Sequence, residues 1–235
     1  MSLVTNLIFI ICAYLVGALP HLQALAKICG IKLEGDFHTA LAQKAGLGIA
    51  VIGIIGEFIK GAIPIIVGRW LDFDINIIAI AGVAAVCGQM WPVFDRFDGE
   101  KGNTIAISMS ACLAYPPMII AIIPIALAAG IRTLNRISTK TQKMTSVFGG
   151  PFSYSLPIGM FIGFLILPLA SWYLNQPPGV TLSFAALFIL IIIIRRLTAG
   201  LARDLSESSD YKRILLGRLF LDRGISEYRS KTVLD

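Results

Sequence analysis

Long apolar runs fill most of the chain, and they decide its fold class. They lie at roughly residues 3–26, 46–68, 75–94, 103–114, 117–131, 146–174 and 180–197. Most of them reach or approach the roughly 20 residues that a straight α-helix needs to cross a bilayer. Because 56% of the residues are hydrophobic and only 14% are charged, one water-soluble core cannot absorb these runs. The sequence therefore predicts an all-α, polytopic integral membrane helix bundle of about seven segments.

Two of the runs, 103–114 and 117–131, are short and flank Tyr115-Pro116-Pro117. They are either two segments or one span bent at the prolines. Two segments, with the N-terminus outside, place 18 of the 20 Lys and Arg residues on the cytoplasmic side. One span would put four of them outside, against the positive-inside rule. We therefore expect two segments, the N-terminus out, the C-terminus in, and the loop 88–104 facing the cytoplasm.

The loop 88–104 is a dense polar stretch between two apolar runs. Its residues 99–104 read Gly-Glu-Lys-Gly-Asn-Thr, and Asn103 opens the next apolar run. Glycine N–H groups, a lysine charge and the N-terminus of a helix together suit a phosphate group. The other interpretation is a tight connection between two membrane helices, with a helix cap at Asn103.

Glu57 and Lys60 stand three residues apart in the middle of the second apolar run, so they share one face of a helix. A charge at that depth costs at least about 2.5 kcal/mol on insertion scales. The two side chains are therefore expected either to line a functional polar cavity or to form an internal ion pair that joins helices.

The remaining reactive side chains form no familiar constellation. His21 and His38 are the only histidines, and neither has a Ser or Cys with a third partner for a nucleophilic triad. The four cysteines form no CxxC pair, so neither a disulfide framework nor a metal site is predicted. No basic stretch is interleaved with aromatics, so the net charge of +6 reflects membrane topology and no nucleic-acid partner is expected.

After the last apolar run the chain turns polar. The sequence divides into a membrane domain over residues 1–203 and a cytoplasmic, partly amphipathic tail over 204–235. Within the tail, the stretch 211–221 either lies on the anionic inner leaflet or packs as a short helix on the cytoplasmic mouth of the bundle. Its apolar face consists of Leu215, Leu216, Leu219 and Phe220.

Three motifs stand out in the membrane domain. They read Ala-Tyr-Leu-Val-Gly at 13–17, Glu-Phe-Ile-Lys-Gly-Ala-Ile-Pro at 57–64, and Gly-Gln-Met-Trp-Pro-Val-Phe-Asp-Arg-Phe-Asp-Gly-Glu-Lys-Gly at 88–102. They resemble Ala-Tyr-Leu-x-Gly, Asp-Phe-x-Lys-Gly-x-x-Pro and Gly-His-x-x-Pro-x-Phe-x-x-Phe-x-Gly-Gly-Lys-Gly of the bacterial acyl-phosphate-dependent glycerol-3-phosphate acyltransferases. That family consists of small seven-helix inner-membrane enzymes, and the resemblance covers roughly residues 10–200.

The chain departs from this family at several motif positions. The family's first-loop motif, Gly-Ser-Gly-Asn-x-Gly-Ala-Thr-Asn, is reduced to Gly-Asp-Phe-His-Thr at 35–39, with Thr39 in the threonine position. Gln89 replaces the central histidine, and Glu100 replaces a glycine. After the last apolar run Arg195 is kept, but the His and Asn of the family's Arg-His-x-x-Asn-Ile are not.

The resemblance implies transfer of a fatty acyl group from an acyl phosphate to the 1-hydroxyl of glycerol 3-phosphate, giving lysophosphatidic acid for phospholipid biosynthesis. It implies Lys101 and Arg195 as the catalytic cations, supported by the polar pair Glu57 and Lys60. The implied residues for binding the substrate phosphate are Gly99, Gly102, Thr39, Asn103 and Thr104. Because an acyl phosphate is already an activated mixed anhydride, no metal or organic cofactor is expected.

The expected partners are membrane lipids, acyl phosphate and glycerol 3-phosphate, with a functional link to an acyl-phosphate-forming enzyme. The expected location is the bacterial inner (plasma) membrane, crossed several times, with the active face in the cytoplasm. Two other functions stay open: a catalytically silent paralogue that binds a lipid phosphate or a partner, and a small-solute transporter built around Glu57 and Lys60.

Overall fold

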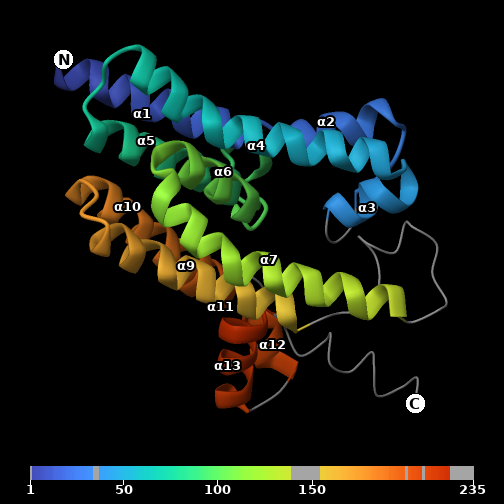
Figure 1. Ribbon diagram of the computed structural model, residues 1–235. Helices are drawn as coiled ribbons and strands as arrows, with labels where there is room; N and C mark the ends of the chain where they lie inside the picture. Colours follow the sequence, from blue (N-terminus) through green and yellow to red (C-terminus); the bar gives the residue numbers. More distant parts are fainter. Residues whose placement is uncertain (1, 34–36, 139–153, 199–200, 208–209, 223–235) are drawn as a thin grey trace.

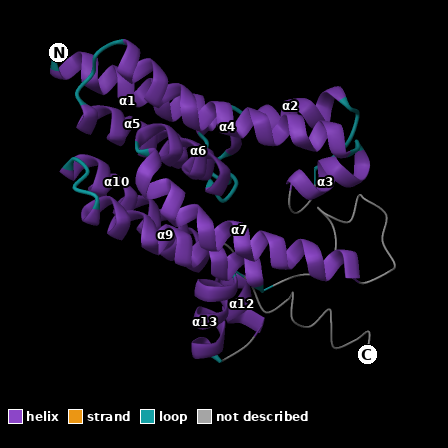
Figure 2. Cartoon of the chain, in the orientation of Figure 1, coloured by secondary structure: helices purple, strands orange, loops and turns teal. Residues whose placement is uncertain are grey.

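The computed structural model describes residues 2–33, 37–138, 154–198, 201–207 and 210–222, and over these ranges the chain forms helices and turns without a strand (Figures 1 and 2). The helices are α1 (Leu3–Ala18), α2 (His21–Ile28), α3 (Phe37–Lys44), α4 (Leu47–Trp70), α5 (Ile75–Met90), the 3₁₀ turn η1 (Val93–Asp95), α6 (Asn103–Leu113), α7 (Tyr115–Ser138), α9 (Ser155–Tyr173), α10 (Pro178–Leu187), the π-helical segment η2 (Phe188–Arg195), α11 (Arg196–Thr198), α12 (Leu201–Glu207) and α13 (Tyr211–Leu221).

The helices confirm the predicted all-α membrane bundle. Among the described residues, six stretches are long and apolar enough to cross a membrane: Leu3–Ile28, Leu47–Trp70, Ile75–Asp95, Tyr115–Asn135, Ser155–Tyr173 and Pro178–Thr198. A seventh apolar helix, Asn103–Leu113, is shorter. The seven predicted runs therefore correspond to six helices long enough to cross a membrane and one shorter apolar helix, and the count of seven membrane segments stays a prediction. The beginning of the run 146–174 lies outside the described residues.

The short helix α6 and the long helix α7 are separate, as charge predicted for the region 103–131. Between them Ala114 is extended, with φ −151° and ψ 95°, which ends α6 at Leu113. Pro116 and Pro117 then occupy the first turn of α7, where the missing N–H group of proline costs least. The two helices contact each other, and both extend from this turn toward the α3 end of the bundle (Figure 1).

Small residues let the helices approach closely, as is common where lipid supplies no hydrophobic force between them. The pairs α1–α5, α4–α6 and α7–α9 make extensive contacts. A methyl group added to Gly61 of α4 would lie 2.5 Å from the carbonyl oxygen of Ile105 in α6. A methyl group on Gly17 of α1 would overlap the backbone of Ala85 in α5.

Two clusters of buried apolar side chains hold the bundle together. The larger one joins α5, α6, α9, α10 and η2. The smaller one fixes α3 against α2 and α4 through Leu22, Leu41 and Ala50. Because α3 is anchored in this way, the side chain of His38 is positioned next to α4.

The two ends of the bundle differ in charge. The turns α4–α5, α6–α7 and α9–α10 gather at the end near the N-terminus (Figure 1). There the guanidinium of Arg69 donates to the carbonyl oxygen of Leu113 at 2.8 Å. The opposite end carries α2, α3 and the end of α7, and with them Lys27, Lys44 and Arg132. This segregation is what the predicted topology requires, and the orientation itself stays a prediction.

The helix α13 packs on the bundle. Arg196 donates to the carbonyl oxygen of Leu219 at 2.8 Å, and the buried Arg218 pairs with Asp204 at 2.5 Å. Three of the four side chains of the predicted apolar face are exposed, whereas Ile214 and Arg218 are buried. The contacts favour packing on the mouth of the bundle over lying on the leaflet. The domain boundary after residue 203 falls within α12 and stays a prediction.

We expect Gly61→Ala to lower the unfolding midpoint of the purified protein in detergent, because its methyl group forces α4 away from α6. The cost of such overpacking is about 1–3 kcal/mol. The matched control is Gly130→Ala in α7, where no atom lies within 4 Å of the added methyl group. Equal shifts for the two variants would contradict close packing at Gly61.

Cysteine labelling tests the topology. In a cysteine-free background, Asn135→Cys at the end of α7 is expected to react with an impermeant reagent from the same side as Lys27→Cys, and Trp70→Cys from the opposite side. The side of Asn135 and Lys27 is expected to be the cytoplasm. Reaction of Asn135→Cys from the side of Trp70→Cys would mean that 103–131 crosses the membrane once.

Candidate functional site

The loop 91–102 is folded back on the end of α5. The N–H group of Gly99 donates to the carbonyl oxygen of Met90 at 3.3 Å, and that of Glu100 donates to the carbonyl oxygen of Gln89 at 3.1 Å. A methyl group on Gly99 would overlap the Gln89 carbonyl, so glycine is required for this close approach. These backbone bonds therefore place the side chain of Glu100 next to the polar C-terminal end of α5.

The helix α6 begins where the loop ends. Gly102 adopts a left-handed conformation with φ 74° and caps α6 without a side-chain hydrogen bond. Asn103 and Thr104 lie in the first turn, whose N–H groups and dipole favour an anion.

The amide of Gln89 joins the two charged residues of α4. Lys60 donates to the amide oxygen of Gln89 at 2.5 Å, and the amide nitrogen donates to the Glu57 carboxylate at 2.9 Å. Lys60 also donates to the carbonyl oxygen of Leu19 at 2.8 Å. Both charged side chains are buried. The predicted pair is thus neither an open channel lining nor a simple ion pair, because a neutral amide from α5 links its two members.

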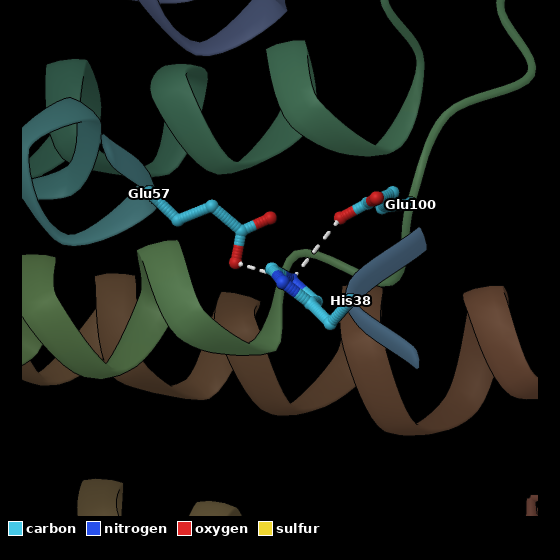
Figure 3. Close-up of side chains that lie close together, drawn as sticks. All are labelled: His38, Glu57 and Glu100. Atoms are coloured by element: carbon cyan, nitrogen blue, oxygen red, sulfur yellow. Dashed lines mark hydrogen bonds and ion pairs between the residues drawn. The ribbon is translucent and has the colours of Figure 1, made fainter. Parts of the chain in front are cut away.

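The network extends to α3 and the loop. The amide nitrogen of Gln89 donates to the Glu100 carboxylate at 3.1 Å. The Nε2 atom of His38 lies 3.1 Å from the Glu57 carboxylate and 3.8 Å from that of Glu100 (Figure 3). Three elements that are distant in sequence therefore converge on one polar cluster.

A small cavity lies beside this network. Its volume is about 30 Å³, which is enough for at least one water molecule. Its polar lining comes from His21, Gln23, Gln89, Asp95 and Glu100. Gln23 donates to Asp95 at 2.5 Å, and this bond ties α2 to η1 across the cavity. A polar ligand can reach the network from this side.

The two predicted catalytic cations occupy different surroundings. The Arg195 guanidinium donates to the carbonyl oxygen of Gly99 and lies 3.7 Å from the carboxylate of Asp98. Arg195 lies at the end of the π-helical segment η2, so the last span places its side chain beside the loop. The side chain of Lys101 is 55% exposed, and its ammonium pairs with Asp222 after α13.

The structure thus brings together most, not all, of the residues singled out from the sequence. Arg195 contacts Gly99, and Asn103 and Thr104 open α6 directly after the loop. Thr39 lies in α3, next in the chain to His38. Lys101 pairs with the C-terminal segment, and its contact with a substrate phosphate stays a prediction.

Sequence reasoning missed the central role of Gln89 and the participation of His38 and Glu100. The sequence marks Gln89 and Glu100 only as departures from a motif, and His38 only as one of the two histidines. The available signal was that departures occur in two separate motifs, at residues 35–39 and 88–102. When replaced residues in two separate motifs compensate for each other, they are expected to be in contact in the folded protein.

Comparison with known proteins places these residues in a family context. The model of the family described as glycerol-3-phosphate acyltransferase matches residues 7–204. Glycerol-3-phosphate acyltransferase 4 of Dehalococcoides mccartyi is 30% identical over 97% of this chain and 91% of its own length. A glycerol-3-phosphate acyltransferase of Pseudomonas aeruginosa is 30% identical over 77% of this chain and 87% of its own length.

Solved structures of the integral membrane glycerol 3-phosphate acyltransferase PlsY (YgiH) share the fold. Its lysophosphatidic acid form superimposes with a TM-score of 0.65 and 21% identity, covering 86% of this chain and 93% of that one. Its glycerol 3-phosphate form gives a TM-score of 0.64 over the same shares. The helical arrangement described above is therefore that of a known membrane fold.

We expect Gln89→Leu to destabilise the protein strongly, because it leaves Glu57 and Lys60 buried without their shared partner. Each lost hydrogen bond to a buried charged group costs about 1.5–3 kcal/mol. The measurement is the unfolding midpoint of the purified protein in detergent, with Gln176→Leu at the opposite end of the bundle as the control. If Gln89→Leu unfolds no earlier than the control, the amide does not hold the two charges.

Proposed function

The chain belongs to the glycerol-3-phosphate acyltransferase family, and from this premise we propose that it transfers a fatty acyl group from an acyl phosphate to glycerol 3-phosphate. The products are lysophosphatidic acid and inorganic phosphate, so the reaction begins phospholipid synthesis. The membrane bundle suits a donor whose acyl chain lies among apolar helices while its phosphate reaches the polar end.

The chemistry asks little of the protein. The acceptor hydroxyl attacks the acyl carbon, a new ester C–O bond forms, and the bond from that carbon to the phosphate oxygen breaks. The hydroxyl proton passes to a base or to the departing phosphate. Because the donor is an activated anhydride, the protein contributes mainly orientation and stabilisation of the developing negative charge. The transfer needs no organic cofactor.

The contact between Arg195 and Gly99 carries the proposal. It fixes a cation from the last span against the glycine loop, although 96 residues separate the two in sequence. Next to them α6 begins without a side-chain cap, so its first-turn dipole favours the same anion. Arg195, the N–H groups at Gly102 and Asn103, and Lys101 together form a cationic setting for a phosphate.

The hydrogen-bond network around Glu57 holds the groups next to the proposed phosphate site in place. Lys60 is held by Gln89 and by the Leu19 carbonyl, so its charge is fixed at the inner edge of the loop. Thr39 in α3 and Thr104 in the first turn of α6 each add a hydroxyl group. We assign Glu57 and Lys60 to positioning, and the phosphate contacts to Gly99, Gly102, Thr39, Asn103 and Thr104.

We place this end of the bundle at the cytoplasmic face of the bacterial inner membrane. Lys27, Lys44 and Arg132 lie at the same end as α2, α3 and the end of α7, as the positive-inside rule requires. An acyl-phosphate-forming enzyme is then the functional partner, because it supplies the donor on that side. Membrane lipids surround the exposed apolar side chains of the spans.

A second candidate is a silent paralogue that binds a phosphate ligand without turnover. Two observations favour it: the Glu100 carboxylate points into the network, and Lys101 is paired with Asp222. Glu57 and Lys60, which suggested a transporter, have partners in Gln89 that account for their burial. A paralogue of this kind keeps phosphate binding and loses transfer.

The test is acyl transfer by the purified protein in lipid vesicles, with palmitoyl phosphate and labelled glycerol 3-phosphate. The wild type is expected to form lysophosphatidic acid, and Lys101→Ala to lose about 10²–10³ in rate, as for loss of one charge-stabilising group. The matched control is Lys27→Ala, an exposed lysine of α2 at the same end, which keeps the full rate.

Transfer by Lys101→Ala at the wild-type rate would remove Lys101 from the site. Folded wild-type protein that is stabilised by glycerol 3-phosphate or acyl phosphate, yet forms no product, would establish the silent paralogue. Folded protein that neither reacts nor gains stability from either compound would overturn both candidates.

A further inference from the structure

The cluster of His38, Glu57 and Glu100 goes beyond what acyl transfer requires. One imidazole nitrogen and one oxygen from each carboxylate lie within 4.8 Å of one another. They come from α3, α4 and the loop before α6, and Figure 3 shows all three side chains pointing to one spot. Such convergence from three elements is built by the fold and is not a run of neighbouring acids.

Charge makes the cluster costly as it stands. Glu57 is only 2% exposed and sits in a membrane-spanning helix, and the Glu100 carboxylate lies beside it. Two like charges at this spacing repel each other, and burial increases the repulsion. The ammonium of Lys60 lies on the far side of the Gln89 amide, where it binds the amide oxygen. The His38 imidazole supplies a positive charge to both carboxylates only when it is protonated, and a metal ion bound to all three groups supplies that charge when the imidazole is neutral.

The donor set fits a metal ion. Bonds of about 2.0–2.2 Å to imidazole nitrogen and carboxylate oxygen place ligand atoms roughly 3–3.6 Å apart on one ion. Nε2 of His38 lies 3.1 Å from Glu57 and 3.8 Å from Glu100, at or slightly above this spacing. All three ligand atoms lie within 4.8 Å of one another, so binding of a single ion requires the carboxylates to turn inward.

Supporting groups of the kind found around metal ligands are present as well. The amide nitrogen of Gln89 donates to both carboxylates, at 2.9 Å to Glu57 and 3.1 Å to Glu100. It thereby orients one oxygen of each, and hydrogen bonds of this kind fix ligand geometry at metal centres. The small cavity lined by Glu100 and Gln89 provides room for water beside one ligand of the cluster.

We propose that His38, Glu57 and Glu100 form a binding site for a divalent transition-metal ion, with Zn²⁺ or Mn²⁺ as the best match. One imidazole with two carboxylates suits these ions, whereas Mg²⁺ and Ca²⁺ prefer oxygen ligands alone. The chain supplies three ligands, so at least one coordination position stays open for water or for an oxygen of another ligand.

The site also deepens the proposed acyl transfer, and this role of the ion rests on that proposed function. Glu100 places a negative charge in a loop that a substrate phosphate must approach. A divalent ion bound to Glu57 and Glu100 cancels that charge, and its open position accepts a phosphate oxygen. The sequence predicted no metal for the transfer, so a bound ion at this site would be an addition specific to this chain.

The experiment measures ion binding without any substrate. Tag-free protein in lipid vesicles is stripped with a chelator and then dialysed against Zn²⁺ or Mn²⁺, and bound ion is counted by elemental analysis. The wild type is expected to bind one ion per chain. His38→Ala and Glu100→Gln are each expected to weaken binding at least about tenfold. The controls are His21→Gln, a histidine outside the cluster, and Asp98→Asn, whose side chain is 93% exposed.

Each outcome has a definite meaning. Binding that both cluster variants lose and both controls keep supports the site, whether or not the protein transfers acyl groups. Failure of the wild type to bind, or equal binding by wild type and cluster variants, overturns it even if transfer is observed. Glu100→Gly serves as a second cluster variant if Glu100→Gln does not fold, because glycine is compatible with the loop.

Discussion

The burial of Glu57 and Lys60 in a membrane-spanning helix is the constraint on which the polar end of this protein depends. Their charges cannot be left alone in a low-dielectric medium, and the chain meets this need with an amide from the neighbouring helix. Gln89 serves both residues only if α4 and α5 keep a fixed register. The break between α1 and α2 contributes too, because it offers the Leu19 carbonyl to Lys60. The bonds of Gln89 therefore also fix the start of the following loop relative to α4.

Hydropathy and charge predicted the spans well, because lipid penalises polar groups along every segment in the same way. The separation of 103–114 from 117–131 followed from basic residues alone, and the extended Ala114 confirms it. The break near Pro20 and the π-helical turns of η2 were not predicted. Both depend on how helices pack against each other. The residues of a single apolar run do not show which helices it will contact.

The site was predicted in part, for the same reason. Glu57 and Lys60 were recognisable from their depth, and the glycine loop from its composition. The link through Gln89 was not recognisable, because a neutral side chain shows its importance only when two helices are in register. The pairing of Lys101 with Asp222 joins residues 121 positions apart, and no local pattern reports it. The catalytic roles of Lys101 and Arg195 stay predictions.

The loop around Gly99 and Lys101 is bound by groups from the far end of the chain, Arg195 and Asp222. During translation the loop leaves the ribosome roughly a hundred residues before its partners. The early helices therefore insert before the loop has its partners. The contacts of the loop form only when the last part of the chain has been made. A chain truncated before Arg195 would therefore insert most of its helices but lack both groups that bind the loop.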